Sequence, residues 1–365
     1  MDAIVIGGGI VGASAAYHLA REGAETLLLD RGDPGRATDA GAGILSPATS
    51  SRTDGRWVEF ATRAVDYYPE LVAELDGETG YARSGTLSVA VSADEIDPFD
   101  EATAEIEDRQ GSLGAPAPDS IERLDPVEAG RRFPPLAETH RALAYSDGAR
   151  VDGRQLARAM RETGRDHGLT VEAASAERIE SGRPVSVETA AGERYEADAV
   201  IVAGGAWSGE FADQLGVGVP VEPQRGQIVH LETDHETGDW PVVKGFRGHY
   251  IVPWPGGRLA VGATRESGSG FDPRATAGGV NEVLEEALRV APGLADATLA
   301  EVRVGLRPTS PDGLPVLGRV ADGVVLATGH GATGLQLGPY SGRLIAESVL
   351  GETPAELEPF TPDRF

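Results

Sequence analysis

Apolar runs separated by glycine turns predict a mixed α/β protein. The chain opens with an apolar run, Ile4–Ile6, followed by a glycine turn and by apolar residues at helical spacing. A second apolar run, Leu27–Leu29, ends on Asp30. Continuous apolar runs of this length are typical of strands in a parallel sheet that is buried on both faces. The pattern therefore predicts a strand–helix–strand unit at the start of the chain.

The same pattern returns in the middle and at the end of the chain. Ala199–Val202 form an apolar run that enters a glycine-rich turn, residues 203–209. Val324–Ala327 enter a further glycine turn, Thr328–Gly334, and the spacing about Tyr340–Leu350 predicts a helix after it. Ligands collect at the carboxyl ends of parallel strands, so the three turns are expected to face one ligand region.

The segments between these units predict a second sheet, which is antiparallel. Gln227–Leu231, Tyr250–Pro253 and Leu259–Gly262 are extended stretches interrupted by proline and glycine. Thr276–Ala291 has its apolar residues on one face and predicts an amphipathic helix beside that sheet. The antiparallel material lies between the dinucleotide-type segments, so two interleaved, discontinuous domains are expected.

Further elements are predicted from shorter patterns. Trp57–Asp76 has apolar residues at steps of three and four and predicts one helix, and Gly153–His167 predicts another. Thr86–Val91 predicts a strand, and 93–110 is acidic and helix-like. Three short apolar segments suit a small β-meander: Leu169–Val171, Ala176–Ile179 and Val185–Thr189.

The first turn carries the glycine spacing G-x-G-x-x-G. Gly7 permits the tight turn, Gly9 lets a pyrophosphate approach bare backbone, and Gly12 lets the helix pack closely on the strand. The helix N-terminus adds N–H groups and a positive dipole end. Asp30 follows 23 residues after Gly7, close to the roughly 20 expected of an acid that binds a ribose hydroxyl. In this strand–turn–helix context the motif predicts a bound dinucleotide, and the long loop 31–51 that follows is expected to be functional.

Composition limits the class of protein. The chain has 365 residues, of which 40% are hydrophobic, enough for two globular domains or one large one with an insertion. No run approaches the roughly 18 apolar residues of a membrane helix, and no basic leader precedes the first strand, so a soluble, cytoplasmic protein is expected. Cysteine is absent, which excludes disulfides, thiolate catalysis, iron–sulfur clusters and a flavin tethered through sulfur.

The charge balance is strongly acidic. The formal net charge is −26, and Lys244 is the only lysine, so 31 of the 32 basic residues are arginine. Such a surface repels nucleic acid, and no nucleic-acid partner is expected. Acidic excess with almost no lysine is typical of a halophilic protein, in which concentrated salt screens the self-repulsion of the chain. An acidic mesophilic protein is the alternative reading.

Six further blocks carry a resemblance that runs nearly end to end. With them the chain resembles the FAD-dependent D-amino-acid oxidase family, and within it the glycine oxidases and deaminating D-amino-acid dehydrogenases. The blocks are GRATDAGAGIL at 35–45, YARSGTL at 81–87, YIVP at 250–253, GATRE at 262–266, GLRPT at 305–309 and TGHGATGL at 328–335.

The resemblance implies a Rossmann-type FAD-binding domain interleaved with an α+β substrate domain built on an antiparallel sheet. The expected FAD-binding segments are 1–50, 141–217 and 300–365, and the expected substrate segments are 51–140 and 218–299. FAD rather than NAD also fits the pattern itself, because an extended dinucleotide needs backbone contacts from several glycine turns and this chain offers three. The flavin is expected to be held without a covalent bond.

The resemblance also implies which residues hold the cofactor. Asp30 is expected at the adenosine ribose, Ala176 on the adenine side, and the last glycine turn at the pyrimidine edge, where the following helix could stabilise negative charge on the reduced flavin. The expected cofactor-binding residues are Gly7, Gly9, Ile10, Val11, Gly12, Asp30, Arg31, Ala37, Thr38, Ala42, Gly43, Ile44, Ala176, Gly204, Gly329, His330, Gly331, Ala332, Thr333, Gly334 and Leu335.

The substrate is expected to be held through its carboxylate. An arginine suits this task because it can bind both carboxylate oxygens. Arg307 follows the apolar strand segment Gly305–Leu306, and Pro308 is expected to end that strand, which would place the guanidinium at a sheet end. Tyr250 resembles the family's substrate-side tyrosine, whose hydroxyl can donate to the same carboxylate, although a sheet aromatic is an alternative reading.

One departure from the family leaves the substrate open. Glycine oxidases of this pattern carry a second arginine in the late glycine turn, where this chain has Ala332. Loss of one of two charged contacts weakens carboxylate binding by about 1.5–3 kcal/mol unless another group replaces it. His249, Arg247, Arg83 and Lys244 are candidate replacements or side-chain selectors, although a surface or structural role is commoner for each.

The resemblance implies oxidation of an amine next to a carboxylate. Hydride leaves the α-carbon for flavin N5 once the amine is neutral, and water hydrolyses the imine to a 2-oxo acid and ammonia. No side-chain base is required, and a structural role is favoured over a base for His330. Glycine, a D-amino acid or a related secondary amine is the expected substrate.

Other readings stay open. The alternatives are a FAD-dependent 2-hydroxy-acid dehydrogenase, which would need a base for the hydroxyl, and a flavin-bearing subunit of a multi-component dehydrogenase. The electron acceptor is expected to be oxygen, a quinone or an electron-transfer partner. The histidines lack metal-ligand spacing, so no metal is expected.

Overall fold

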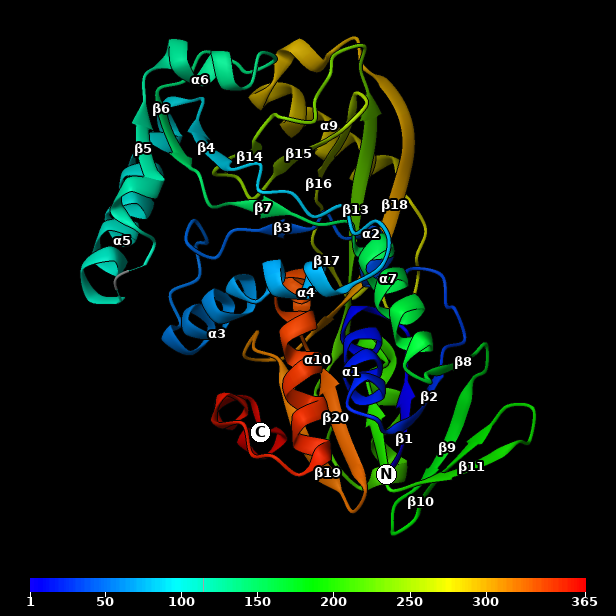
Figure 1. Ribbon diagram of the computed structural model, residues 1–365. Helices are drawn as coiled ribbons and strands as arrows, with labels where there is room; N and C mark the ends of the chain where they lie inside the picture. The colour runs from blue at the N-terminus through cyan, green and yellow to red at the C-terminus, as the bar shows by residue number, and fades with distance from the viewer. Residues whose placement is uncertain (114) are drawn as a thin grey trace.

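Two large β-sheets organise the molecule. The computed structural model describes residues 1–113 and 115–365, and in this part of the chain one sheet has six strands and the other has nine. The six-stranded sheet lies in the lower half of Figure 1, and the nine-stranded sheet lies in the upper half. None of the helices formed by these residues combines the length and the apolar character needed to cross a bilayer.

The six-stranded sheet contains the predicted apolar strands. Its neighbouring strands are parallel except at the β19–β20 edge. Beside it, helix α1 (Ile10–Arg21) packs against both α7 (Gly153–Asp166) and α10 (Gly334–Leu350) (Figure 1). The strand order is β19 (Val316–Ala321), β20 (Val324–Thr328), β12 (Ala199–Val202), β1 (Asp2–Ile6), β2 (Glu25–Leu29) and β8 (Thr170–Glu172).

The nine-stranded sheet contains the predicted antiparallel strands. Its strand pairs are antiparallel except for β14–β4, and helix α9 (Ala277–Val290) packs on it through Val283 and Ala287. β18 (Thr298–Thr309) pairs with β13. The order of the others is β17 (Glu266–Ser267), β13 (Glu222–Glu232), β16 (Arg258–Gly262), β15 (Tyr250–Trp254), β14 (Val242–Lys244), β4 (Thr86–Ala90), β6 (Arg141–Tyr145) and β5 (Ile121–Leu124).

Smaller elements surround the sheets. A three-stranded sheet and a two-stranded ribbon complete the described strands, and short helices cover the edges. The strands are β9 (Ala176–Glu180), β10 (Val185–Thr189), β11 (Arg194–Ala197), β3 (Ile44–Leu45) and β7 (Ala149–Arg150). The helices are α2 (Ala37–Ala40), α3 (Gly55–Asp66), α4 (Tyr68–Glu74), α5 (Ile96–Leu113), α6 (Pro126–Arg132) and α8 (Ala212–Leu215).

The long strand β18 links the two sheets. It lies beside β13 and runs from the upper sheet towards the lower one (Figure 1). Near its end, Leu306 forms a β-bridge with Arg36 and Thr309 forms one with His330. Residues 305–309 therefore belong to the nine-stranded sheet and are also bridged to the segments that surround the glycine turns. Pro308 does not end the strand as expected, because β18 continues to Thr309.

Three predicted elements differ from the structure. Leu169–Val171 was assigned to the meander, but β8 extends the six-stranded sheet beside β2, and β11 completes the meander. The apolar pattern of a short strand does not specify its partner, which explains the error. The helix predicted over Trp57–Asp76 is two helices, because Pro69 in the first turn of α4 lacks the N–H that would continue α3.

The last helix begins earlier than predicted. Gly334, Gly338 and Pro339 suggest a break, yet α10 runs through all three. A Cβ on Gly338 would lie 2.8 Å from Ile10 Cγ2, and one on Gly342 would lie 2.6 Å from Ser14 Cβ. These glycines therefore allow α10 to pack closely on α1, and tertiary packing outweighs their low helix propensity. The predicted domain boundaries stay a prediction. Strand β6 of the upper sheet lies inside the predicted FAD-binding segment 141–217, and β18 crosses the boundary predicted at residue 300.

Candidate functional site

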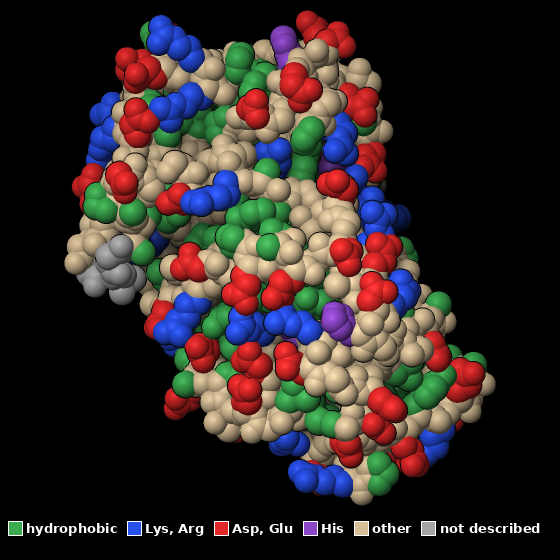
Figure 2. Space-filling view, viewed as in Figure 1, with side chains coloured by type: hydrophobic (Ala, Val, Ile, Leu, Met, Phe, Trp, Pro, Cys, Tyr) green, Lys and Arg blue, Asp and Glu red, His purple; other side chains and the backbone are tan. Residues whose placement is uncertain are grey.

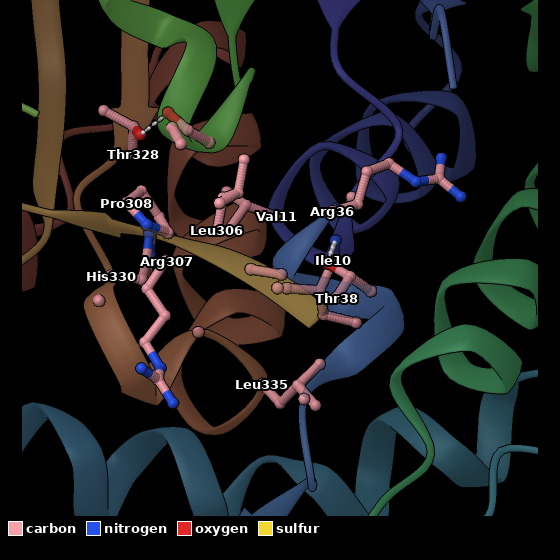
Figure 3. Close-up of a pocket in the computed structure, with 18 of the residues that line it drawn as sticks. Ile10, Val11, Arg36, Thr38, Leu306, Arg307, Pro308, Thr328, His330 and Leu335 are labelled. Atoms are coloured by element: carbon pink, nitrogen blue, oxygen red, sulfur yellow. Dashed lines mark hydrogen bonds between the residues drawn. The ribbon is translucent and has the colours of Figure 1, made fainter. Parts of the chain in front are cut away.

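A cavity of about 360 Å³ connects the glycine turns with the nine-stranded sheet. Its walls come from the turns after β1, β12 and β20, from the loop between β2 and β3, and from β13, β14, β15 and β18. Figure 3 shows this arrangement: Ile10 and Thr38 lie together at the start of α1, while Leu306, Arg307 and Pro308 come from β18. The cavity has the size and position of a ligand site in an open α/β sheet.

The first glycine turn forms a bare backbone cradle. Gly7 has φ +102°, and a Cβ on it would lie 2.5 Å from the carbonyl oxygen of Ala203. A Cβ on Gly12 would overlap the carbonyl oxygen of Gly7. The turn after β1 therefore packs directly on the turn after β12, with no room for side chains. Ile10 N–H donates to Thr38 Oγ1 at 2.9 Å, which fixes the loop over the helix start. This cradle fits a pyrophosphate.

Asp30 lies beside that cradle at the end of β2. A Cβ on Gly8 would lie 2.5 Å from Asp30 Oδ2, so the carboxylate is in direct contact with the turn. Arg36 Nη1 donates to the same oxygen at 2.7 Å, and Arg36 also pairs with Asp39. The Asp30 carboxylate thus lies beside the cradle, where it could accept a hydrogen bond from a ribose hydroxyl, and it already accepts one from Arg36.

The third glycine turn closes the cavity from the side of β20. Thr328 Oγ1 donates to the carbonyl oxygen of Gly205 at 2.9 Å, which ties this turn to the one after β12 (Figure 3). The His330 side chain is buried, and its Nε2 lies 3.0 Å from Ser341 Oγ. Burial lowers the pKa of His330 to about 4, so the imidazole is neutral near pH 7. The side chain of His330 is thus engaged in structure, as expected.

Arg307 enters the cavity from β18 without a carboxylate partner. Its guanidinium lies over Gly226, where a Cβ would overlap it, and Nη1 donates to the carbonyl oxygen of Thr264 at 2.9 Å. Among the described residues no carboxylate forms an ion pair with it, although Arg225 beside it on β13 has two. Burial lowers the pKa of Arg307, which shows the cost of leaving this cation without an anion.

Tyr250 stands next to Arg307 on the same wall. Its hydroxyl reaches across Gly262, where a Cβ would lie 3.0 Å from it. Burial raises the pKa of Tyr250, and the charge of Arg307 opposes that rise. The phenol is therefore protonated near pH 7 and can donate a hydrogen bond beside the guanidinium. Together the two side chains suit a carboxylate.

Most of the residues predicted from the sequence line this cavity. Gly12 and Gly329 do not line it; Gly12 instead permits close packing, and Gly329 has φ +77°. The predicted residues on the cavity wall are Gly7, Gly9, Ile10, Val11, Asp30, Arg31, Ala37, Thr38, Ala42, Gly43, Ile44, Ala176, Gly204, Tyr250, Arg307, His330, Gly331, Ala332, Thr333, Gly334 and Leu335.

The structure also selects among the candidate replacements for the missing arginine at Ala332. Lys244 lines the cavity, whereas His249, Arg247 and Arg83 do not. Arg265 lines it too, and the lining residues that the sequence did not predict include Ser46, Ser50, Trp57 and Gln336. Nothing in the local sequence pattern distinguishes these four residues from ordinary core and loop residues. Trp57, for example, also fits the apolar face of a helix.

Comparison with known proteins places these features in one family. The chain matches the DAO family, described as FAD dependent oxidoreductase, over residues 2–348. It is 43% identical to the oxidoreductase YurR of Bacillus subtilis (strain 168) over 98% of both chains. It is 31% identical to the glycine oxidase of Bacillus licheniformis, covering 96% of this chain and 93% of that protein.

Solved structures agree with the fold. The crystal structure of iminodiacetate oxidase from Chelativorans sp. BNC1 superposes with a TM-score of 0.92 at 40% identity. The superposition covers 99% of this chain and 98% of that one. The mixed α/β architecture, with one mainly parallel and one mainly antiparallel sheet, is therefore that of this group of oxidases.

Proposed function

This chain belongs to the DAO family of FAD-dependent oxidoreductases and binds FAD, and on that basis we propose that it oxidises the carbon–nitrogen bond of an amino acid or secondary amine. Glycine, a D-amino acid or a related N-substituted amino acid is the proposed substrate class. The observation that carries the proposal is the partly buried Arg307, which faces the cavity beside the Tyr250 hydroxyl without a carboxylate of its own.

The residues that would hold FAD lie along the cavity in the same order as the groups of the cofactor that they would contact. The cradle at Gly7 and Gly9 suits the pyrophosphate, Asp30 suits the adenosine ribose, and the N-terminus of α10 adjoins the turn that closes the other end. When bound there, FAD would supply a two-electron acceptor for hydride from the substrate carbon, and the substrate would be left with a carbon–nitrogen double bond. Water then adds to that bond and releases a 2-oxo acid and ammonia or a primary amine.

The chain's own side chains contribute binding and orientation. Arg307 and Tyr250 would fix the carboxylate, and the apolar side chains of Ile44 and Ile228 would exclude water from the reacting carbon. His330 is hydrogen-bonded to Ser341 and cannot readily take a proton from the substrate. The amine nitrogen therefore has to lose its proton before hydride transfer, and the cationic surroundings favour that neutral form.

Reduction of the flavin by a panel of substrates tests the proposal. The holoenzyme in molar salt is mixed anaerobically with glycine, N-methylglycine, D-alanine, iminodiacetate, glycolate and D-lactate, and the loss of flavin absorbance is followed. Bleaching by one or more amines is expected. Bleaching only by the hydroxy acids would overturn the proposal in favour of a 2-hydroxy-acid dehydrogenase.

The same experiment identifies the electron acceptor from the reoxidation of the reduced flavin. Rapid return of the absorbance when air is admitted identifies an oxidase. Return only after a quinone is added identifies a dehydrogenase or a subunit that passes electrons to a partner. Oxygen is the proposed acceptor, because the glycine oxidase of Bacillus licheniformis and the iminodiacetate oxidase of Chelativorans sp. BNC1 are both named as oxidases.

A further inference from the structure

We propose that the substrate of this site is an amine with two carboxylates, one bound by Arg307 and Tyr250 and the other by Lys244 and its neighbours. This inference rests on the proposed function and specifies its substrate class. It comes from a second group of hydrogen-bond donors on the cavity wall. We call this group the Lys244 wall: Lys244, Trp57 and Gln336, together with Ser46 and Ser50.

Lys244 lies on the same face of the sheet as Tyr250. The two residues are directly opposite each other in the β14–β15 pair, so their side chains leave the sheet in the same direction. Lys244 Nζ donates to the carbonyl oxygen and to the hydroxyl of Thr49. An ammonium has three N–H donors, so these bonds leave one for the cavity that Lys244 lines. Among the described residues no carboxylate forms an ion pair with it, and the neighbouring charge that acts on it is that of Arg109.

Two more donors of the Lys244 wall lack an acceptor. Trp57 Nε1 and Gln336 Nε2 are buried, and neither has a hydrogen-bond partner in the described part of the chain. Leaving a buried donor unpaired costs about 1–3 kcal/mol, and both residues belong to the cavity wall. The pairing of Gln336 Oε1 with Ser46 N–H at 3.2 Å directs the other amide atom, Nε2, away from that loop.

The donors are held by one hydrogen-bonded loop. Gln336 accepts from Ser46, Ser46 Oγ lies 2.6 Å from Thr49 Oγ1, and Thr49 accepts from Lys244. Arg109 fixes the same loop from α5 by donating to the carbonyl oxygen of Arg52 at 2.8 Å. The Lys244 wall is therefore assembled from three distant parts of the chain and is ordered before a ligand arrives, which is what a specific site requires.

The charge of the cavity is divided between its ends. The acidic residues on its wall are Asp30, Asp33 and Glu210, and each pairs with Arg31 or Arg36 at the dinucleotide end. The other end has Lys244, Arg265 and Arg307 and, among the described lining residues, no carboxylate. This excess of positive charge occurs in a chain whose net charge is −26.

An anionic ligand explains why this local charge is tolerated. Burial lowers the pKa of Lys244 to about 8. The loss of solvation therefore makes the charged ammonium less favourable here than it is in water. A single carboxylate on Arg307 would leave Lys244 without a counterion, and a second one would neutralise it.

The strand spacing suits a short connection between the carboxylates. Lys244, Tyr250, Gly262 and Ile228 form one row across four neighbouring strands. Three strand intervals separate the Cα atoms at the ends of this row by about 14 Å. The long side chains of Lys244 and of Arg307, which lies over Gly226 near the far end, shorten the gap between the charges. A few covalent bonds between the two carboxylates are therefore sufficient.

Two amines that differ in one group provide the test. Iminodiacetate and N-ethylglycine have the same chain length, and a methyl group in the second replaces a carboxylate in the first. We expect kcat/KM of the holoenzyme to be at least about tenfold higher for iminodiacetate, as one charge-assisted contact predicts. In the variant Lys244→Met the ratio of the two kcat/KM values should fall by about tenfold or more. The surface variant Arg141→Met, which breaks an exposed pair with Asp100, should leave the ratio unchanged.

A second measurement needs no variant and so does not depend on how Lys244→Met folds. Malonate, succinate and glutarate are titrated as competitive inhibitors of the wild-type holoenzyme beside acetate, propionate and butyrate. At least one dicarboxylate should bind about tenfold more tightly than its monocarboxylate counterpart. The best chain length then gives the spacing of the two anion sites.

The outcomes separate this inference from the proposed function. If amines reduce the flavin but the second carboxylate brings no advantage in rate or inhibition, the dicarboxylate inference is wrong and the amine activity stands. It is also wrong if Lys244→Met lowers kcat/KM equally for both amines, since Lys244 would then support the loop or the flavin. If no amine reduces the flavin, the proposed function itself fails.

Discussion

At the scale of single residues, the surroundings of a charge decide its role. Arg303 and Arg307 lie four residues apart on β18 and have the same chemistry. Arg303 Nε donates to Glu301 Oε1 at 2.7 Å, so its charge is already neutralised. Arg307 contacts only neutral oxygens and faces the cavity. Only the second arrangement leaves a cation that gains free energy from an anionic ligand.

The variant Arg307→Leu tests this difference. Loss of a charge-assisted carboxylate contact should raise KM for the best amine by about 10- to 100-fold, corresponding to roughly 1.5–3 kcal/mol. Arg303→Leu is the matched control from the same strand, and its KM should stay within a few fold of the wild-type value. Steady-state kinetics with protein of equal flavin content measures both. An unchanged KM in Arg307→Leu would remove the carboxylate role of this side chain.

At the scale of elements, the glycine turns are shaped by contacts between segments. Gly7 and Gly23 both have positive φ, +102° and +83°. A Cβ on Gly23 would meet nothing within 4 Å, whereas one on Gly7 would lie 2.5 Å from the carbonyl oxygen of Ala203. Both positions therefore favour glycine because of their positive φ. Only at Gly7 would a side chain also clash with a neighbouring segment. The difference arises because β1 and β12 are neighbours in the sheet.

Replacing each glycine with alanine separates the cost of a left-handed backbone from the cost of a steric clash between two turns. Gly23→Ala should cost only the left-handed backbone penalty of about 1–2 kcal/mol and keep its flavin. Gly7→Ala should cost more, because the turns after β1 and β12 must move apart, and the purified variant should contain less FAD. The flavin-to-protein absorbance ratio and the melting temperature measure the two effects. Equal flavin content in both variants would contradict the cradle at Gly7.

At the scale of the whole molecule, the charge is the dominant feature. Asp and Glu side chains are spread over both halves of the face in Figure 2, and many arginines lie among them. Pairs such as Arg123–Glu107 and Arg183–Asp322 are solvent-exposed, so each contributes little stability. The excess of acidic groups remains, and mutual repulsion opposes the compact state until salt screens it.

The melting temperature of the holoenzyme should therefore rise by several degrees from dilute buffer to molar KCl. The measurement is made at saturating FAD, because bound cofactor itself stabilises the folded state. Sucrose is the control, since it is excluded from protein surfaces without screening charge. A melting temperature that is insensitive to KCl would contradict a halophilic adaptation and favour the reading of an ordinary acidic protein.

The sequence alone determined the features that depend on residues close together in the chain. Apolar runs, the glycine spacing at 7, 9 and 12, and the acid at Asp30 specify a strand–turn–helix unit, because steric and hydrogen-bond requirements act within a few residues. The family blocks then identified FAD and predicted a carboxylate-binding role for Arg307. For the same reason the local pattern could not assign β8 to its partner strand or find the start of α10, which depends on close packing against α1.

Only the tertiary structure decided what faces the substrate. Trp57, Lys244 and Gln336 come from a helix, a strand and another helix that are far apart in the sequence. Each side chain has an ordinary local reading, and only the packing of the two sheets brings the three residues to one cavity. The free energy of an unpaired donor or an uncompensated charge depends on what surrounds it in three dimensions. Local patterns do not contain that information.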